Sequence, residues 1–273
     1  MTDPAGDAPL HDPALQAAVL ADAALAFSGI PGIETVAEAD LVRTFAPGRP
    51  QPYVNVITRL AMPPDTLPER VAAVEPAYRA AGLPTLWWVD AAARSAGLLD
   101  ALRATGMRDP GPETVMARRP GGELPEPPAG VAVRIVASIE ALDDWIGVMA
   151  GAYGWSDPAR AALMRGLYDP RLPHGRDGAR VVLLATLAGR PVGAGSLFRA
   201  AGQGWITNIG TLPAARGRGV GRAVTRAALH LSAERGDPTT WLAASEMGEP
   251  LYAGLGFRSV GRIDHLVGPA PRG

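Results

Sequence analysis

The C-terminal half of the chain alternates between short apolar runs and longer amphipathic ones. Apolar runs at 131–136, 180–187, 192–199, 205–212, 239–243 and 257–267 have the length and composition of buried strands. Between them, residues 138–153, 157–167 and 220–235 repeat apolar positions at helical spacing. Ser138 is placed to cap the first of these helices, and Asp157-Pro158 to start the second. This order predicts an α/β fold in which helices flank a mixed central sheet.

A stretch rich in proline and glycine separates this half from the N-terminal one. Residues 120–130 read PGGELPEPPAG, a composition that cannot sustain regular structure. We therefore expect an N-terminal domain at 1–119, a linker at 120–130, and a second domain at 131–273.

The segment between the strand at 205–212 and the helix at 220–235 is the most informative one. Residues 212–222 read LPAARGRGVGR. The first amides of a helix have no partner within it, and together with the helix dipole they attract phosphate. Glycine lets a ligand approach the backbone closely and tolerates a positive φ. This segment therefore predicts a site for a phosphorylated cofactor.

The spacing of the glycines decides which cofactor. Gly217, Gly219 and Gly221 give G-x-G-x-G, where a dinucleotide site needs G-x-G-x-x-G, and a P-loop needs a lysine that the chain lacks. The pattern Arg216-x-x-Gly219-x-Gly221, with Pro213 three residues before the arginine, instead resembles the pyrophosphate loop of the GNAT superfamily of acyl-CoA-dependent N-acetyltransferases.

A second segment, SEMGEPLYAGLGF at 245–257, resembles the C-terminal signature of the same superfamily. Pro250 suits the first turn of a short helix and Gly256 the position just past its end. The resemblance implies that Tyr252 lies near the cofactor sulfur and protonates the departing thiolate. Ser245 stands where the superfamily often has asparagine, and we expect it to bond the pantetheine arm.

The resemblance implies acetyl-CoA as co-substrate, no metal, and the acyl-CoA N-acyltransferase fold. Main-chain groups of the strand before the loop would hold pantetheine, and the loop amides would hold the diphosphate. Arg218 and Arg222 share a helix face and could pair with phosphate oxygens, whereas Arg226 is expected on a solvated face. The expected cofactor contacts are Ile209, Thr211, Arg216, Gly217, Arg218, Gly219, Val220, Gly221, Arg222 and Ser245.

The N-terminal half repeats part of this pattern, which predicts a tandem duplication. Strands are expected at 53–60, 84–89 and 114–118, and helices at 67–81 and 98–105. Where the phosphate loop should lie, residues 60–65 read LAMPPD; prolines lack amide donors and Asp65 would repel phosphate. This half resembles a degenerate GNAT domain that cannot bind CoA in the usual way. An unrelated α/β domain is the alternative.

The composition excludes several classes of binding partner and several kinds of site. The net charge of −1 gives no field that favours nucleic acid or an anionic membrane. The absence of cysteine excludes disulfides and thiolate catalysis, and the 4 histidines lack a metal-ligand spacing. Residues 1–13 do not resemble a signal peptide, and no apolar run is long enough to span a bilayer. We expect a cytoplasmic protein.

The predicted function is an acetyl-CoA-dependent N-acetyltransferase that acts directly on the amine of a small molecule or peptide. Transfer of another short acyl group is one alternative. A CoA-binding regulatory or scaffold protein is the other, because residues 205–208 lack the glutamate that many relatives carry. A water chain remains open as the general base, and Tyr153 and Trp155 could line the acceptor pocket. The candidate side-chain bases are Glu246, Asp157, His174 and His265.

Overall fold

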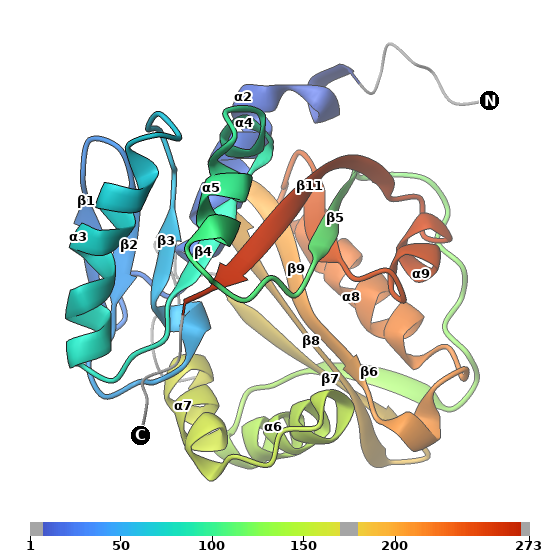
Figure 1. Cartoon of the computed structure of the whole chain (residues 1–273). Coiled ribbons are helices and arrows are strands. Elements are labelled where there is room, and N and C mark those ends of the chain that lie inside the picture. The colour runs from blue at the N-terminus through green and yellow to red at the C-terminus, as the bar shows by residue number, and fades with distance from the viewer. Residues whose placement is uncertain (1–7, 170–179, 269–273) are drawn as a thin grey trace. The chain divides into compact units, whose positions relative to one another are not determined.

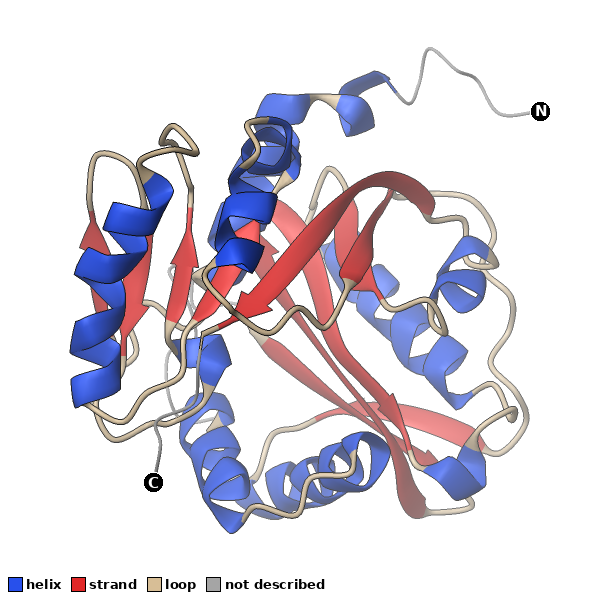
Figure 2. Cartoon of the chain, in the orientation of Figure 1, coloured by secondary structure: helices blue, strands red, loops and turns tan. Residues whose placement is uncertain are grey.

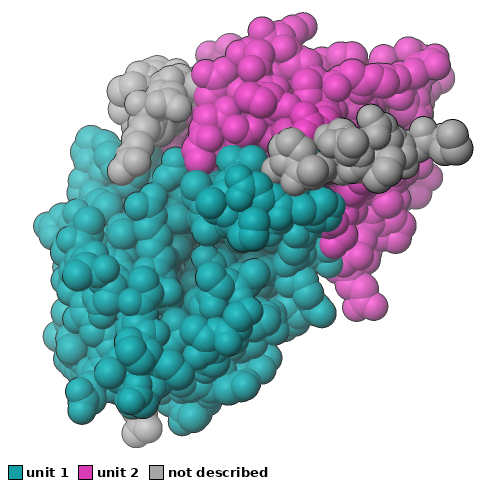
Figure 3. Space-filling model, turned by 90° about the horizontal axis from the view of Figure 1, so that it is seen from above, with its two compact units in different colours: residues 1–115, 260–273 teal, residues 116–259 magenta. Residues whose placement is uncertain are grey.

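The chain divides into two compact units, which are coloured separately in Figure 3. A computed structural model describes residues 8–169 and 180–268. Unit 1 comprises Met1–Val115 and Val260–Gly273, and unit 2 comprises Met116–Ser259. No helix within the described residues is both long and apolar enough to cross a membrane.

Unit 2 is built on a mixed sheet (Figure 1). Its strands are β6 (Val131–Ile135), β7 (Val181–Leu187), β8 (Arg190–Ala200), β9 (Gln203–Thr211) and β10 (Thr240–Ala244). They follow the order β10-β9-β8-β7-β6, and β9 and β10 run parallel while the other neighbours run antiparallel. The helices are α6 (Ile139–Tyr153), α7 (Pro158–Tyr168), α8 (Val220–Glu234) and α9 (Glu249–Ala253).

Helices α6 and α8 pack on opposite faces of this sheet. A Cβ on Gly195 of β8 would point at Val224 of α8. Gly210 of β9 pairs with Ala194, the neighbour of Gly195, and a Cβ there would point at Ala152 of α6. Because successive strand residues point to opposite faces, the two helices lie on opposite sides. The α8 face holds the core of unit 2.

The strands of unit 1 follow the order β1-β2-β3-β4-β11. The strands are β1 (Glu34–Ala37), β2 (Val42–Phe45), β3 (Val56–Thr58), β4 (Leu86–Val89) and β11 (Arg258–Val267). The helices are α2 (Pro13–Ala24), α3 (Leu67–Ala80), α4 (Ala91–Ser95) and α5 (Leu98–Ala104), and Figure 2 separates helices from strands by colour. Buried side chains of α3, α5 and the strands form one hydrophobic core.

The boundaries between the two units do not coincide with the ends of strands. The last four residues of β11 pair antiparallel with β4, from Asp264↔Val89 to Val267↔Leu86, and Leu266 is buried in the core of unit 1. Strand β5 (Pro112–Arg118) is hydrogen-bonded to β10, and Met116 belongs to the core of unit 2. The expected domains at 1–119 and 131–273 follow the sequence, whereas the two compact units divide within β5 and within β11.

The predicted α/β class and most of the predicted elements are confirmed. Ser138 accepts a hydrogen bond from the Ala141 amide at 3.2 Å as the N-cap of α6, and residues 119–130 form no helix or strand. The strand predicted at 53–60 is wrong in extent, because residues 52–54 form a 3₁₀ turn and only β3 follows. The Asn55 side chain there bonds the backbone at Ala46, Arg49 and Gln51, so it competes with strand pairing.

Candidate functional site

The loop between β9 and α8 carries a row of unused amides. The chain leaves β9 through a 3₁₀ turn at Pro213–Ala215, and Gly217 and Gly219 then have φ of +72° and +75°. The Arg216 amide donates to the Pro213 carbonyl at 3.3 Å. The amides of residues 217–222 donate to no acceptor in the described part of the chain. Such a row, at the positive end of α8, can bind a diphosphate.

Strands β9 and β10 separate beside this loop. In the described part of the chain they pair at Gly204↔Thr240 and Trp205↔Trp241, near the start of both strands. Beyond these pairs β9 continues through a bulge at Asn208, which has a φ of +59°. One edge of β9 near Ile209 is therefore open for hydrogen bonds to an extended ligand.

The residues expected to hold the cofactor converge on the first turn of α8. A Cβ on Gly221 would lie 3.0 Å from Leu251 Cδ1, 3.7 Å from Thr211 Oγ1 and 3.9 Å from Ile209 Cγ2. Helix α9 and the end of β9 therefore meet at Gly221. Any side chain there would press on both, which is a packing reason for glycine at this position.

Tyr252 lies on α9 at the edge of the core of unit 2. Its side chain is 8% exposed, and its ring packs edge-to-face on Phe257 with centroids 6.0 Å apart. A Cβ on Gly248 would lie 3.0 Å from Tyr252 Cε2 and 3.5 Å from Ser245 Oγ. Ser245 is exposed at the end of β10, and its carbonyl accepts the Gly248 amide at 2.8 Å. The turn at 245–248 thus brings Ser245 and Tyr252 together.

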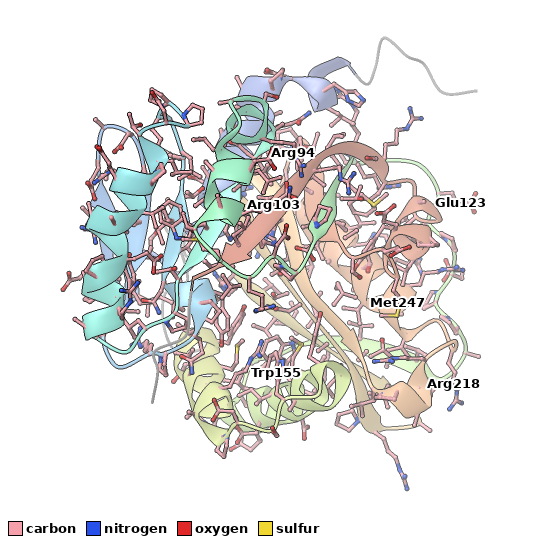
Figure 4. All side chains as sticks on the ribbon, viewed as in Figure 1. Arg94, Arg103, Glu123, Trp155, Arg218 and Met247 are labelled. Atoms are coloured by element: carbon pink, nitrogen blue, oxygen red, sulfur yellow. The ribbon has the colours of Figure 1, made fainter. Side chains whose placement is uncertain are left out.

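The three arginines on the α8 face differ in their surroundings. Arg218, labelled in Figure 4 on the loop, and Arg222 are both exposed, and neither has a described partner. Arg226 was expected on a solvated face, and this is wrong: its side chain is 18% exposed and donates two hydrogen bonds to Glu126, at 3.1 and 3.0 Å. Only Arg218 and Arg222 are thus available to phosphate.

The end of α6 places an aromatic pair beside β9. Tyr153 is 52% exposed, and its hydroxyl donates to the Ile209 carbonyl at 3.1 Å. Its ring stacks on Trp155 with centroids 5.8 Å apart, and the Arg160 guanidinium lies 3.8 Å from the centroid of Trp155, which Figure 4 labels. These side chains border the strand on which pantetheine is expected.

The candidate bases are scattered. Asp157 accepts the Ala159 amide at 2.8 Å as the N-cap of α7, and Glu246 is exposed in the turn before α9, next to Met247 of Figure 4. His265 lies in unit 1, with Nδ1 3.3 Å from Glu113 Oε2. His174 lies outside the described residues.

A polar cluster at the β9 bulge was not found from the sequence. Asn208 Nδ2 donates to the Tyr168 hydroxyl at 2.6 Å and to Ser196 Oγ at 3.1 Å. The Arg180 guanidinium lies 4.9 Å from the Tyr168 ring centroid, and burial lowers the pKa of Arg180. Asparagine tolerates a positive φ better than most residues, so Asn208 in a strand was the available signal.

Comparison with known proteins agrees with this geometry. Residues 178–259, which include the open strand, the loop, α8 and α9, match the acetyltransferase (GNAT) domain family. These residues are similar to a GNAT domain. A mycothiol acetyltransferase from Clavibacter sepedonicus is 36% identical over 110 residues, which is 40% of this chain but only 36% of that protein. The chain therefore spans about a third of this curated relative.

Solved structures extend the likeness to both units. A GCN5-related N-acetyltransferase from Kribbella flavida is 24% identical and superposes with a TM-score of 0.69 over 92% of this chain and 96% of its own. A tandem GNAT protein from the clavulanic acid biosynthesis pathway has a TM-score of 0.60 at 15% identity, over 97% and 94% of the two chains. The chain has the fold of these proteins, as the sequence predicted, and the residues that match the GNAT family carry the unused loop amides.

Proposed function

We propose that this protein is an acetyl-CoA-dependent N-acetyltransferase that passes the acetyl group directly to an amine of a small molecule or peptide. The main support is the row of unused amides at 217–222, next to the open edge of β9. A diphosphate and an extended amide chain are the two groups that such neighbouring surfaces complement, and coenzyme A contains both in that order.

The proposed cofactor pose uses the expected contacts in turn, apart from Arg216. The diphosphate accepts hydrogen bonds from the amides of 217–222, with Arg218 and Arg222 as cations beside it. Pantetheine follows β9 past Thr211 and Ile209, and Ser245 borders it from the end of β10. The thioester then lies near Tyr252. Holding donor and acceptor in line in this way can lower the barrier by several kcal/mol.

The proposed reaction is a direct displacement. The amine nitrogen attacks the thioester carbonyl, a carbon–nitrogen bond forms, and the carbon–sulfur bond breaks. Tyr252 gives its hydroxyl proton to the departing thiolate, and it regains a proton from solvent. An ordinary alkyl amine has a pKa of about 10.4, so only about one molecule in a thousand is neutral at pH 7. Since residues 205–208 carry no carboxylate, we propose that water removes the amine proton.

Calorimetry with acetyl-CoA tests the diphosphate site. We expect the double variant Arg218→Glu, Arg222→Glu to bind at least about tenfold more weakly than the wild type, because it replaces two cations beside a polyanion. Arg190→Glu, an exposed arginine at the β7–β8 turn, is the matched control and should bind normally. Equal binding by the double variant would remove the loop from the proposal.

Thiol release against a panel of amines tests the chemistry. Tyr252→Phe should lower kcat by roughly tenfold to a hundredfold while leaving the acetyl-CoA affinity unchanged, because general acids typically contribute at least this much. An unchanged kcat would exclude Tyr252 as the acid. Tight acetyl-CoA binding by a wild type that turns over no amine would favour a CoA-binding regulatory protein.

A further inference from the structure

The irregular segment before β6 is fastened to α8. We call residues 124–128 the strap. Leu124 packs against the core of unit 2, and Glu126 accepts two hydrogen bonds from Arg226, at 3.0 and 3.1 Å. The Pro128 carbonyl accepts the Val131 amide at 3.2 Å, which anchors the strap at the start of β6. A linker with such contacts is part of the folded unit.

Pro128 is in contact with the loop itself. Gly219 is the N-cap of α8, with a φ of +75° and a carbonyl that accepts the Ala223 amide at 3.0 Å. A Cβ on Gly219 would overlap the Pro128 ring, whereas the same position on Gly217 is open on all sides to 4 Å. The ring therefore covers one side of Gly219 and leaves Gly217 uncovered.

This contact matters because it supports the stretch between Arg216 and α8, whose amides have no described acceptor to fix them. The amides of 217–222 have no described acceptor, and glycines adopt more backbone conformations than other residues. A binding site that must first be ordered loses affinity to that ordering, so a rigid support improves binding without touching the ligand. Proline is a suitable support because its ring fixes its own φ.

We propose that the strap is a positioning element of the cofactor site: Pro128 holds Gly219 so that the first amides of α8 face the diphosphate. The inference rests on the proposed function. Pro128 contacts Gly219 where a Cβ would stand, and it has no amide proton with which to bind a phosphate itself. The Glu126–Arg226 pair holds the strap along α8, but Glu126 is 85% exposed, so its contribution is small. Pro128 is therefore the residue to test.

Two glycines of equal strain provide the experiment. Gly217→Ala and Gly219→Ala both place a Cβ on a residue with positive φ, but only the second overlaps Pro128. We expect Gly219→Ala to bind CoA about tenfold more weakly than Gly217→Ala, since the overlap with Pro128 would displace Gly219 and the first amides of α8. Calorimetry measures the affinity, and thermal unfolding is followed in parallel.

Pro128→Ala gives the decisive comparison. In the wild-type background it should weaken CoA binding about threefold, because the support is lost. In the Gly219→Ala background it should strengthen binding, because the overlap is relieved. Equal CoA affinities of the two alanine variants, or changes in thermal unfolding with no change in CoA affinity, would overturn the inference. A wild type that does not bind CoA would instead overturn the proposed function.

Discussion

Both the side chain and the amide of Arg216 donate hydrogen bonds to other groups of the protein. Its guanidinium donates to the Ala152 carbonyl at 3.1 Å and to the Thr211 carbonyl at 3.4 Å. Ala152 lies in the last turn of α6, where unpaired carbonyls attract cations. With its amide in the 3₁₀ turn, Arg216 ties the end of α6 to the end of β9. We infer that it shapes the loop, while the following residues bind the diphosphate.

Tyr78 of α3 predicts how unit 1 responds to alkali. Its side chain is fully buried, its hydroxyl donates to the Thr44 carbonyl at 2.7 Å, and burial raises its pKa to about 12. The unfolded chain ionises near the ordinary value of 10. The contribution of neutral Tyr78 to the free energy of unfolding is therefore fully present below pH 10 and is lost as the pH rises toward 12, by about 3 kcal/mol.

Urea unfolding between pH 8 and 11 checks this expectation. Tyr78→Phe should be less stable at pH 8, by about 1 kcal/mol for the lost hydrogen bond, but its stability should fall less steeply above pH 10. Parallel curves for the variant and the wild type would show that Tyr78 does not set the alkaline response.

Contacts between residues close in the sequence could be predicted from the sequence, whereas contacts between distant residues could not. The caps Ser138 and Asp157 follow from local hydrogen-bonding chemistry, and both cap as predicted. Glu126 and Arg226 are separated by 100 positions, so no local pattern connects them. The same limit hid the contacts of Asn208 with Tyr168 and Ser196, which depend on how three elements pack.

At the scale of elements, α8 lies so close to the sheet that β8 has no room for a side chain at Gly195. A Cβ on Gly195 would lie 2.5 Å from Val224 Cγ1 and 2.8 Å from Ile209 Cδ1. Ile209 is a residue of the open strand, so the helix, the strand and the loop form one packed group. A displacement of α8 would move the loop amides with it.

Two glycine substitutions test this close packing. Gly195→Ala should destabilise the protein by about 1–3 kcal/mol, because the added methyl group overlaps two neighbours. Gly147→Ala on α6, where a Cβ meets nothing within 4 Å, should stabilise it by up to about 1 kcal/mol through helix propensity. Denaturant unfolding measures both. A Gly195→Ala protein as stable as the wild type would mean that α8 can move away without cost.

Helix α2 was missed from the sequence for a physical reason. Its residues Pro13–Ala24 are nearly all alanine, leucine or valine, so no polar face marks a helical period. The signal that was present is local: Asp12 accepts the Ala14 amide at 2.9 Å, and Pro13 occupies the first turn. The short strands β1 and β2 carry too few residues for a period to show.

At the scale of the whole molecule, unit 1 is discontinuous and depends on β11, which follows unit 2 in the sequence. Removing the residues after Ser259 should destabilise unit 1, because β4 loses one of its two partners and Leu266 leaves the core. Loss of a buried leucine alone typically costs 2–5 kcal/mol. Residues 116–259 retain their own core and should remain folded.

Hydrogen exchange of the truncated protein, resolved by peptide, distinguishes the two units. Amides of α3 and β4 should lose protection, and those of α8 and β8 should keep it. The milder variant Leu266→Ala should show the same pattern with a smaller change. Loss of protection confined to residues 116–259 would contradict the assignment of β11 to unit 1.

The position of β11 also affects the order in which the two units can fold during translation. Residues 8–115 leave the ribosome first, but their sheet is completed only by residues 264–267, which are translated after the whole of unit 2. Until then, one edge of β4 in the nascent chain has backbone groups without a strand partner. Such edges can pair with strands of other chains. We expect unit 2 to mature first, although it is encoded second.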